Sequence, residues 1–156
     1  MRDFDVCVIG GGPSGFAAAV RCWDFGKRVC LVEKAAIGGA GLHNGALSSK
    51  TMWELSKDYL KALKRDRGYS ALDITVNCGQ VMNTVAQAVD EKQDQLNEQL
   101  RALSKPHPGS DGIIERLNGV ARFADPHTIV VESSDGSSAR KVSADHFVIA
   151  TGSRPR

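Results

Sequence analysis

Short apolar runs alternate with a longer alanine-rich stretch at the start of the chain. Val6 to Ile9 is a continuous apolar run that ends at three glycines, as expected of a strand buried on both faces. Pro13 can begin a helix, because the N–H that proline lacks would have no hydrogen-bond acceptor in the first turn of a helix. The stretch from Phe16 to Phe25 is rich in apolar residues. A second apolar run spans Arg28 to Glu33, so this part of the chain predicts a β-α-β unit. The glycine-rich stretch from Ala35 to Asn44 then predicts a loop whose backbone can approach a ligand closely.

Two longer segments carry apolar residues at helical spacing. From Thr51 to Arg67 they lie on one face with lysines on another, and Gly68 follows, which predicts an amphipathic helix. A second apolar stripe runs from Gln80 to Ser104 and is interrupted by Lys92 and Gln93. We expect this second helix to pack in the core rather than to bind a partner.

The last third of the chain contains short strand-like segments. Prolines and glycines between Lys105 and Gly112 stop any helix there. Beyond them, turn residues separate Gly119 to Phe123, Thr128 to Glu132 and Lys141 to Ser143, which predicts an antiparallel meander. Phe147 to Ala150 predicts one more buried strand. The order of the elements is that of an α/β fold.

Length and composition limit the class of protein. The chain has 156 residues, of which 42% are hydrophobic and 24% charged, as expected of one soluble globular domain. A net charge of +2 is too small to indicate a nucleic acid or a membrane as partner. The four cysteines form no C-x-x-C pair, and the charged N-terminus leads into an apolar run too short for a signal peptide. We therefore expect reduced thiols and a cytoplasmic protein.

The first glycine-rich segment matches a nucleotide-binding pattern. Gly10-Gly11-Gly12-Pro13-Ser14-Gly15 fits G-x-G-x-x-G between a predicted strand and a predicted helix, the context that makes this pattern informative. Gly10 permits the turn, Gly12 lets the backbone approach a pyrophosphate, and Gly15 lets the helix pack closely on the strand. Glu33 ends the second strand and is placed to accept hydrogen bonds from two ribose hydroxyls. An adenine dinucleotide is the expected ligand, and a turn that binds nothing is the alternative.

Two further segments carry a resemblance to a known family. Ala150-Thr151-Gly152-Ser153-Arg154-Pro155 follows the last apolar run, and Gly38-Gly39 leads through His43 to Ser49-Lys50. With the fingerprint and the meander, in the same order, they resemble the flavoprotein disulfide reductases (pyridine nucleotide-disulfide oxidoreductases). Dihydrolipoamide dehydrogenase, mercuric reductase and soluble transhydrogenase belong to that family.

The resemblance implies FAD as the cofactor and one Rossmann-like FAD-binding domain over residues 1–156. This domain would combine a parallel sheet, a long helical pair and a small antiparallel meander. The resemblance also implies that Lys50 is catalytic, because it matches a lysine that stabilises negative charge on the reduced flavin. No metal site is implied. The implied cofactor-binding residues are Gly10, Gly12, Pro13, Ser14, Gly15, Glu33, Lys34, Gly39, Ala40, Gly41, Lys50, Ala121, Thr151 and Gly152.

The chain departs from the family's pattern in two ways. Gly41 and Ala46 stand where the family has a C-x4-C pair, so dithiol–disulfide exchange by the usual route is not available. The chain also stops where family members continue into nicotinamide-binding and dimerisation domains. We therefore expect the N-terminal portion of an NAD(P)H-dependent flavoprotein oxidoreductase, a homodimer when full length and inactive as this chain alone. The missing strand of the flavin domain predicts weak FAD retention and an exposed sheet edge.

Three points stay open from the sequence. The fingerprint also suits an NAD-binding dehydrogenase module, and a catalytically idle relative with a structural role would also have lost both cysteines. His43 is either a proton donor near the flavin or a loop histidine bonded to backbone. The expected electron acceptor is a quinone, oxygen or a second nicotinamide.

Overall fold

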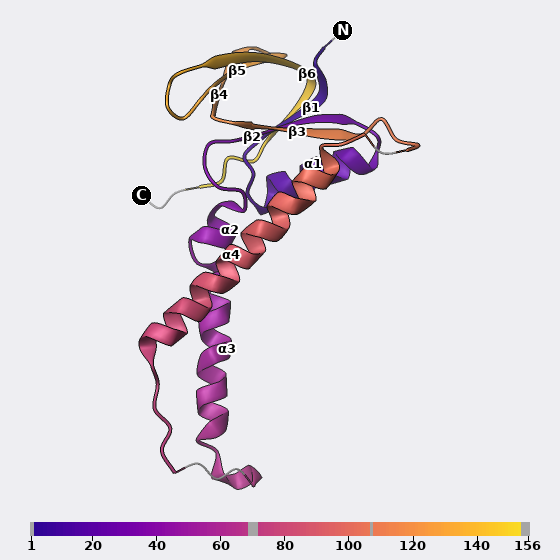
Figure 1. Ribbon diagram of the computed structural model, residues 1–156. Coiled ribbons are helices and arrows are strands. Elements are labelled where there is room, and N and C mark those ends of the chain that lie inside the picture. The colour runs from indigo at the N-terminus through magenta and orange to yellow at the C-terminus, as the bar shows by residue number, and fades with distance from the viewer. Residues whose placement is uncertain (1, 69–71, 107, 154–156) are drawn as a thin grey trace.

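A computed structural model describes residues 2–68, 72–106 and 108–153 (Figure 1). The Arg154-Pro155 end of the closing segment therefore lies outside the described residues. A single sheet of six strands, in the order β3-β2-β1-β6-β5-β4, organises the chain.

The parallel half of the sheet holds the predicted β-α-β unit. β1 (Phe4–Ile9) pairs in parallel with β2 (Arg28–Glu33), and β2 pairs in parallel with β3 (Ile113–Asn118). The helix α1 (Pro13–Asp24) begins at a proline and ends before Gly26, whose φ of 72° stops it. The Rossmann-like prediction is confirmed by this arrangement.

The antiparallel half is the predicted meander. β4 (Val120–Asp125) pairs with β5 (Thr128–Glu132), and β5 pairs with the first part of β6 (Ala139–Ile149). The second part of β6 turns to pair in parallel with β1. On its other side, this second part pairs with no strand of the described chain, and Ile149 is 68% exposed, so the predicted open edge is present.

Apolar residues form one core on each face of the parallel strands. On one face they pack against α1 and against α4 (Cys78–Leu103), whose Leu100 is buried there. On the other face they pack against the meander, with Ile129 and Val142 buried beside Cys7 and Cys30. Because both faces are covered, the strands are continuous apolar runs rather than alternating ones.

The helical pair departs from its prediction. α3 (Ala46–Ala62) has no buried residue, and in the first half of α4 Met82 is 53% exposed. Figure 1 shows α3 and this part of α4 extending away from the sheet side by side, as their contacts also indicate. The prediction of a buried stripe is therefore wrong at Met82, whereas Val85 and Leu100 are each 5% exposed. The second half of α4 contacts the sheet.

Several elements differ from the sequence-based expectation. The predicted loop at Ala35 to Asn44 contains a short helix, α2 (Gly39–His43), because buried Leu42 folds back over Gly38. The helix predicted from Thr51 begins earlier, because Gly45 at a φ of 133° forms its N-cap. The strands predicted on either side of Asp145 are one strand, β6, since no turn residue interrupts them.

The end of the predicted amphipathic helix also differs. α3 ends at Ala62, and a separate 3-10 turn, η1 (Arg65–Arg67), precedes Gly68 with its φ of 78°. In the described part of the chain, no helix combines the length and the apolar character needed to cross a bilayer.

Candidate cofactor site

The turn between β1 and α1 contains glycines at which neighbouring atoms leave no room for a side chain, as at Gly10 and Gly15. Gly10 has a φ of 109°, and its amide donates to the carbonyl of Val32 at 2.8 Å. A Cβ on Gly15 would overlap the carbonyl oxygen of Gly10. The first turn of α1 therefore rests directly on the backbone of the turn.

The helix N-terminus at this turn has free donors. Gly12 is the N-cap of α1, and no side chain caps the helix. Within the described residues, no oxygen accepts from the amides of Gly12, Ser14 or Gly15. A Cβ on Gly12 would have only the Cα of Gly39, at 4.0 Å, within contact range. Unpaired amides and the positive end of the helix dipole make this open position suitable for an anion.

Glu33 reaches the turn from the end of β2. It is 9% exposed, and its Oε2 accepts from the Gly11 amide at 2.6 Å while its Oε1 accepts from the Ala35 amide at 2.9 Å. The Gly11 amide is therefore occupied by Glu33, the residue that the sequence predicted to bind the ribose of the dinucleotide. Because each carboxylate oxygen has a second lone pair, Glu33 can still accept from hydroxyl groups.

A basic residue lies near Glu33 on the neighbouring strand β3. Arg116 Nη1 donates to Asn97 Oδ1 of α4 at 3.0 Å, and Nε is buried without a partner among the described residues. Burial lowers the pKa of the Arg116 guanidinium, and the negative charge of Glu33 opposes that shift. The buried carboxylate thus has a favourable cation in its surroundings.

The short helix α2 forms the second wall of the site. The Gly38 amide donates to the Gly11 carbonyl at 2.9 Å, and a Cβ on Gly39 would lie 2.9 Å from the Cα of Gly12. A Cβ on Gly41 would lie 2.6 Å from Cγ of Pro13. Glycines therefore let the two backbones approach each other on either side of the open position at Gly12.

These walls enclose a groove of about 420 Å³. The end of β6 supplies its third side through Thr151 and Gly152. A smaller cavity of about 150 Å³ adjoins it at Gly10, Glu33 and Lys34 and extends to Ala121. The predicted residues that line the groove are Gly10, Gly12, Pro13, Ser14, Glu33, Lys34, Gly39, Ala40, Gly41, Thr151 and Gly152.

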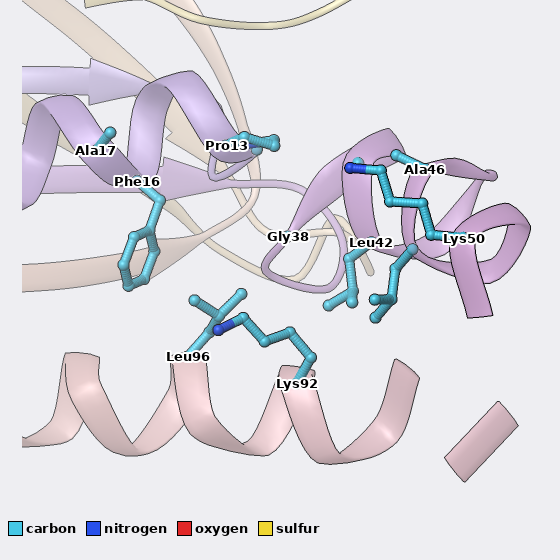
Figure 2. A pocket seen from close by; sticks show the side chains of 12 residues that line it. Pro13, Phe16, Ala17, Gly38, Leu42, Ala46, Lys50, Lys92 and Leu96 are labelled. Carbon is cyan, nitrogen blue, oxygen red and sulfur yellow. The ribbon is translucent and has the colours of Figure 1, made fainter. Parts of the chain in front are cut away.

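Three predicted residues lie elsewhere. Ala121 lines only the adjoining cavity. Gly15 lines neither space, but it packs against the backbone of Gly10 in the turn. Lys50 lines a third cavity, which meets the groove at Gly12, Pro13 and Gly41 (Figure 2). The structure thus brings the turn, α2 and the end of β6 together and sets Lys50 beside them.

Sequence reasoning missed several lining residues of the groove. Ala35, Ala36, Asn44 and Ser153 line it but were not among the predicted site residues. Their signal was the glycine-rich stretch from Ala35 to Asn44 and the closing segment that contains Ser153. His43 Nε2 lies 3.0 Å from the carbonyl oxygen of Ile37, which is the backbone-bonded alternative of the two considered.

Comparison with known proteins identifies the family. The family model described as pyridine nucleotide-disulphide oxidoreductase matches residues 4–156. The chain is 33% identical over 154 residues to the mitochondrial dihydrolipoyl dehydrogenase of Schizosaccharomyces pombe, covering 97% of this chain and 28% of that protein. It is 30% identical over 159 residues to the soluble pyridine nucleotide transhydrogenase of Mycobacterium tuberculosis, covering 99% and 32%.

A solved structure has the same fold. The HOCl-induced flavoprotein disulfide reductase of Escherichia coli, determined as a Cu(II) complex, superposes with a TM-score of 0.73 at 19% identity, over 97% of this chain and 29% of that one. The chain spans about 30% of the length of the proteins it matches.

Proposed function

The chain belongs to the pyridine nucleotide-disulphide oxidoreductase family, and we propose that it is the FAD-binding part of an NAD(P)H-dependent flavoprotein oxidoreductase. The observation that carries the proposal is the bare turn at Gly12, where unpaired amides at a helix N-terminus face an open groove with Glu33 beside it. The named relatives are dehydrogenases and transhydrogenases, which supports a redox role.

The shape of the site fits an extended dinucleotide. The amides of Gly12, Ser14 and Gly15 would hold the pyrophosphate, and Glu33 would accept from the hydroxyls of the adenosine ribose. The cavity at Ala121 would hold the adenine, and the longer groove past Thr151 would hold the opposite end. FAD, when bound, would supply hydride-transfer chemistry that no side chain of the chain can perform.

The chain's own residues would orient the cofactor and set the charge around it. Lys50 adjoins the groove on the side of α2 and α3, and its ammonium group would stabilise negative charge there. Gly41 and Ala46 carry no sulfur, so no dithiol would store the electrons. The reduced flavin would instead pass the electrons directly to the acceptor. The longer protein would be a homodimer and would act in the cytoplasm.

Titration of the purified chain with FAD tests the proposal. We expect FAD to bind and NAD⁺ to compete only weakly, since a dehydrogenase module would show the reverse order. Gly12→Ala is expected to raise the Kd for FAD by at least about tenfold, because its methyl group points into the groove while meeting no protein atom closer than 4.0 Å.

Gly79→Ala serves as the control. Gly79 lies in the first turn of α4, outside the residues lining the groove, so this variant should bind FAD like the unchanged chain. Equal loss of FAD affinity in both variants, or tighter binding of NAD⁺ than of FAD, would overturn the proposal. In the longer protein, bleaching of the flavin by NADH would separate an active enzyme from an idle relative.

A further inference from the structure

The strand β3 forms one edge of the sheet, at the end opposite to β4. The amide of Ile113, at the start of β3, donates to the carbonyl of Lys27 at 3.3 Å. The amide of Gly119, directly after the strand, donates to the carbonyl of Glu33 at 2.9 Å. Because successive residues of a paired strand direct their backbone groups to opposite sides, every second residue between them faces away from β2. Within the part of the chain that the structure describes, these outward N–H and C=O groups have no hydrogen-bond partner, and they belong to Ile114, Arg116 and Asn118.

A groove of about 540 Å³ lies between this strand and α4. Its lining residues are Ile113, Ile114, Glu115 and Arg116 of β3 and Asn97, Leu100, Arg101 and Ser104 of α4. Figure 1 shows the second half of α4 alongside the sheet near β3, as their contacts also indicate. A helix beside an unpaired strand leaves a groove in which an extended peptide can lie and add a strand to the sheet.

The charges in this groove favour an acidic ligand. Glu115 forms an ion pair with Arg140 of β6, so its charge is compensated within the chain. Arg116 Nη1 donates to the neutral Asn97 at 3.0 Å, and Arg101 follows Asn97 by four residues, on the same face of α4. Among the described residues, neither Arg116 nor Arg101 forms an ion pair. Arginine side chains without an acidic partner are suited to bind a carboxylate.

A second copy of the chain fits this edge poorly. Only one antiparallel pairing of two copies engages all three outward-facing residues of each strand, and it places Arg116 of one copy opposite Arg116 of the other. Like charges directly opposite each other destabilise a strand pair. A strand with a carboxylate opposite Arg116 would replace this repulsion by an attraction.

We propose that the groove between β3 and α4 binds an extended acidic segment of a partner protein, which adds a strand to the sheet beside β3. A Glu or Asp side chain of the segment would lie next to Arg116, and an apolar side chain two residues away would lie against Ile114. The groove shares no lining residue with the cofactor groove or with the cavities beside it. The proposal therefore goes beyond the proposed function and does not depend on FAD binding.

The peptide acetyl-TVTETVT-amide tests the proposal, because its glutamate and both valines share one face when it is extended. Amide hydrogen exchange of the chain is followed by NMR. Without peptide, the amides of Ile114, Arg116 and Asn118 should exchange faster than those of Glu115 and Leu117, which face β2. Saturating peptide should slow exchange at the three outward amides by at least about tenfold, because a bound strand accepts from them.

Two altered peptides separate the contributions of charge and backbone. Replacing the glutamate by glutamine should weaken binding about five- to tenfold, because the arginines then face a neutral side chain. Replacing both threonines beside the glutamate by proline should abolish binding, because proline lacks the N–H and does not fit inside a sheet. Equal binding of the glutamate and glutamine peptides, or binding of the proline peptide as tight as that of the original, would overturn the proposal.

Arginine variants test which side chains recognise the acid. Arg116→Gln should weaken binding of the glutamate peptide about five- to tenfold and leave the glutamine peptide unaffected. Arg101→Gln, on an exposed position of α4, should cause about a threefold loss for the glutamate peptide without any risk to the core. Arg21→Gln is the control, since Arg21 pairs with Asp24 on α1 and does not line the groove. Equal effects of Arg101→Gln and Arg21→Gln would overturn the role of charge.

Two further outcomes would assign the edge to another occupant. Slow exchange of the three outward amides that appears without peptide as the concentration of the chain rises would indicate a second copy. Slow exchange of the same amides in the longer protein, at any concentration and without peptide, would indicate that another part of that protein covers β3. Either result would overturn the proposal and leave the proposed function intact, which the FAD titration decides separately.

Discussion

The carboxylate of Glu33 is hydrogen-bonded to the backbone of Gly11, with its Oε2 atom 2.6 Å from the amide nitrogen. The end of β2 is thereby joined to the turn after β1, across the two strands that the β-α-β unit places side by side. A residue assigned to ligand binding therefore also fixes the shape of the site before any ligand arrives.

Glu33→Gln should weaken both the fold and cofactor binding. One oxygen acceptor becomes an NH₂ donor, so either the Gly11 or the Ala35 amide loses its partner in a buried place. We expect the free energy of unfolding to fall by about 1–3 kcal/mol and the Kd for FAD to rise at least about tenfold, measured by urea denaturation and by FAD titration.

Glu132→Gln is the control for that substitution. Glu132 is exposed at the end of β5 and lies 3.7 Å from Arg122, so its loss should cost less than about 0.5 kcal/mol. A Glu33→Gln chain as stable as this control would show that the two buried hydrogen bonds contribute little.

Gly15→Ala should lower the free energy of unfolding of the chain. Its methyl group would overlap the Gly10 carbonyl, so α1 has to move off the turn, at a cost of about 2–3 kcal/mol in the free energy of unfolding. Gly12→Ala, three residues away, should cost no more than about 1 kcal/mol, because its methyl group meets open space and only the N-cap preference for glycine over alanine is lost. Equal stability of the two variants in urea denaturation would refute this division of roles.

The sequence predicted those elements whose cause is local. The bounds of β2 and β5 follow directly from apolar runs flanked by turn residues. Gly10 has the positive φ expected of the turn, and Gly15 has the close packing expected of it. The single strand β6 was not foreseen, because the switch from pairing with β5 to pairing with β1 depends on partners distant in sequence.

Other features depend on tertiary contacts that no local pattern reveals. β3 was missed because its Ile-Ile-Glu-Arg sequence is neither a continuous apolar run nor an alternating one. Glu115 forms an ion pair with Arg140, and Arg116 donates a hydrogen bond to Asn97. The exposure of Met82 was missed because helical periodicity predicts an apolar face but not what covers it.

The carboxyl group of Asp135, in the serine-rich turn between β5 and β6, should titrate at unusually low pH. Asp135 Oδ1 accepts from Ser133 Oγ at 2.6 Å and from the Ser137 amide at 3.0 Å, and these bonds lower the pKa of Asp135 to about 2. Because the folded-state pKa is depressed, the stabilisation is present above the ordinary value of 3.8 and is lost as the pH falls through about 2. An NMR titration of the carboxyl carbon should give that midpoint.

Two serine variants test the cause of this shift. Ser133→Ala should raise the midpoint toward the ordinary value, because it removes the largest contribution. Ser134→Ala should leave the midpoint unchanged, since Ser134 Oγ donates to the Lys34 carbonyl instead. A midpoint near 3.8 in the unchanged chain would contradict the geometry of the turn.

Cysteines placed at Gly41 and Ala46, where the family resemblance implies a cysteine pair, should destabilise the chain at one of the two positions. A Cβ on Gly41 would lie 2.6 Å from Cγ of Pro13, so Gly41→Cys forces α2 away from the turn and should cost about 1–3 kcal/mol in the free energy of unfolding. Ala46 already carries a Cβ and is exposed at the start of α3, so the free energy of unfolding of Ala46→Cys should stay within about 0.5 kcal/mol of that of the unchanged chain.

The double variant should therefore be destabilised by nearly the same amount as Gly41→Cys and should bind FAD less tightly, because α2 is one wall of the groove. Urea denaturation under reducing conditions and FAD titration measure the two effects. A double variant that is as stable as Ala46→Cys would contradict this prediction. It would mean that Pro13 moves aside at little cost and that the close approach of α2 to the turn does not exclude a side chain at position 41.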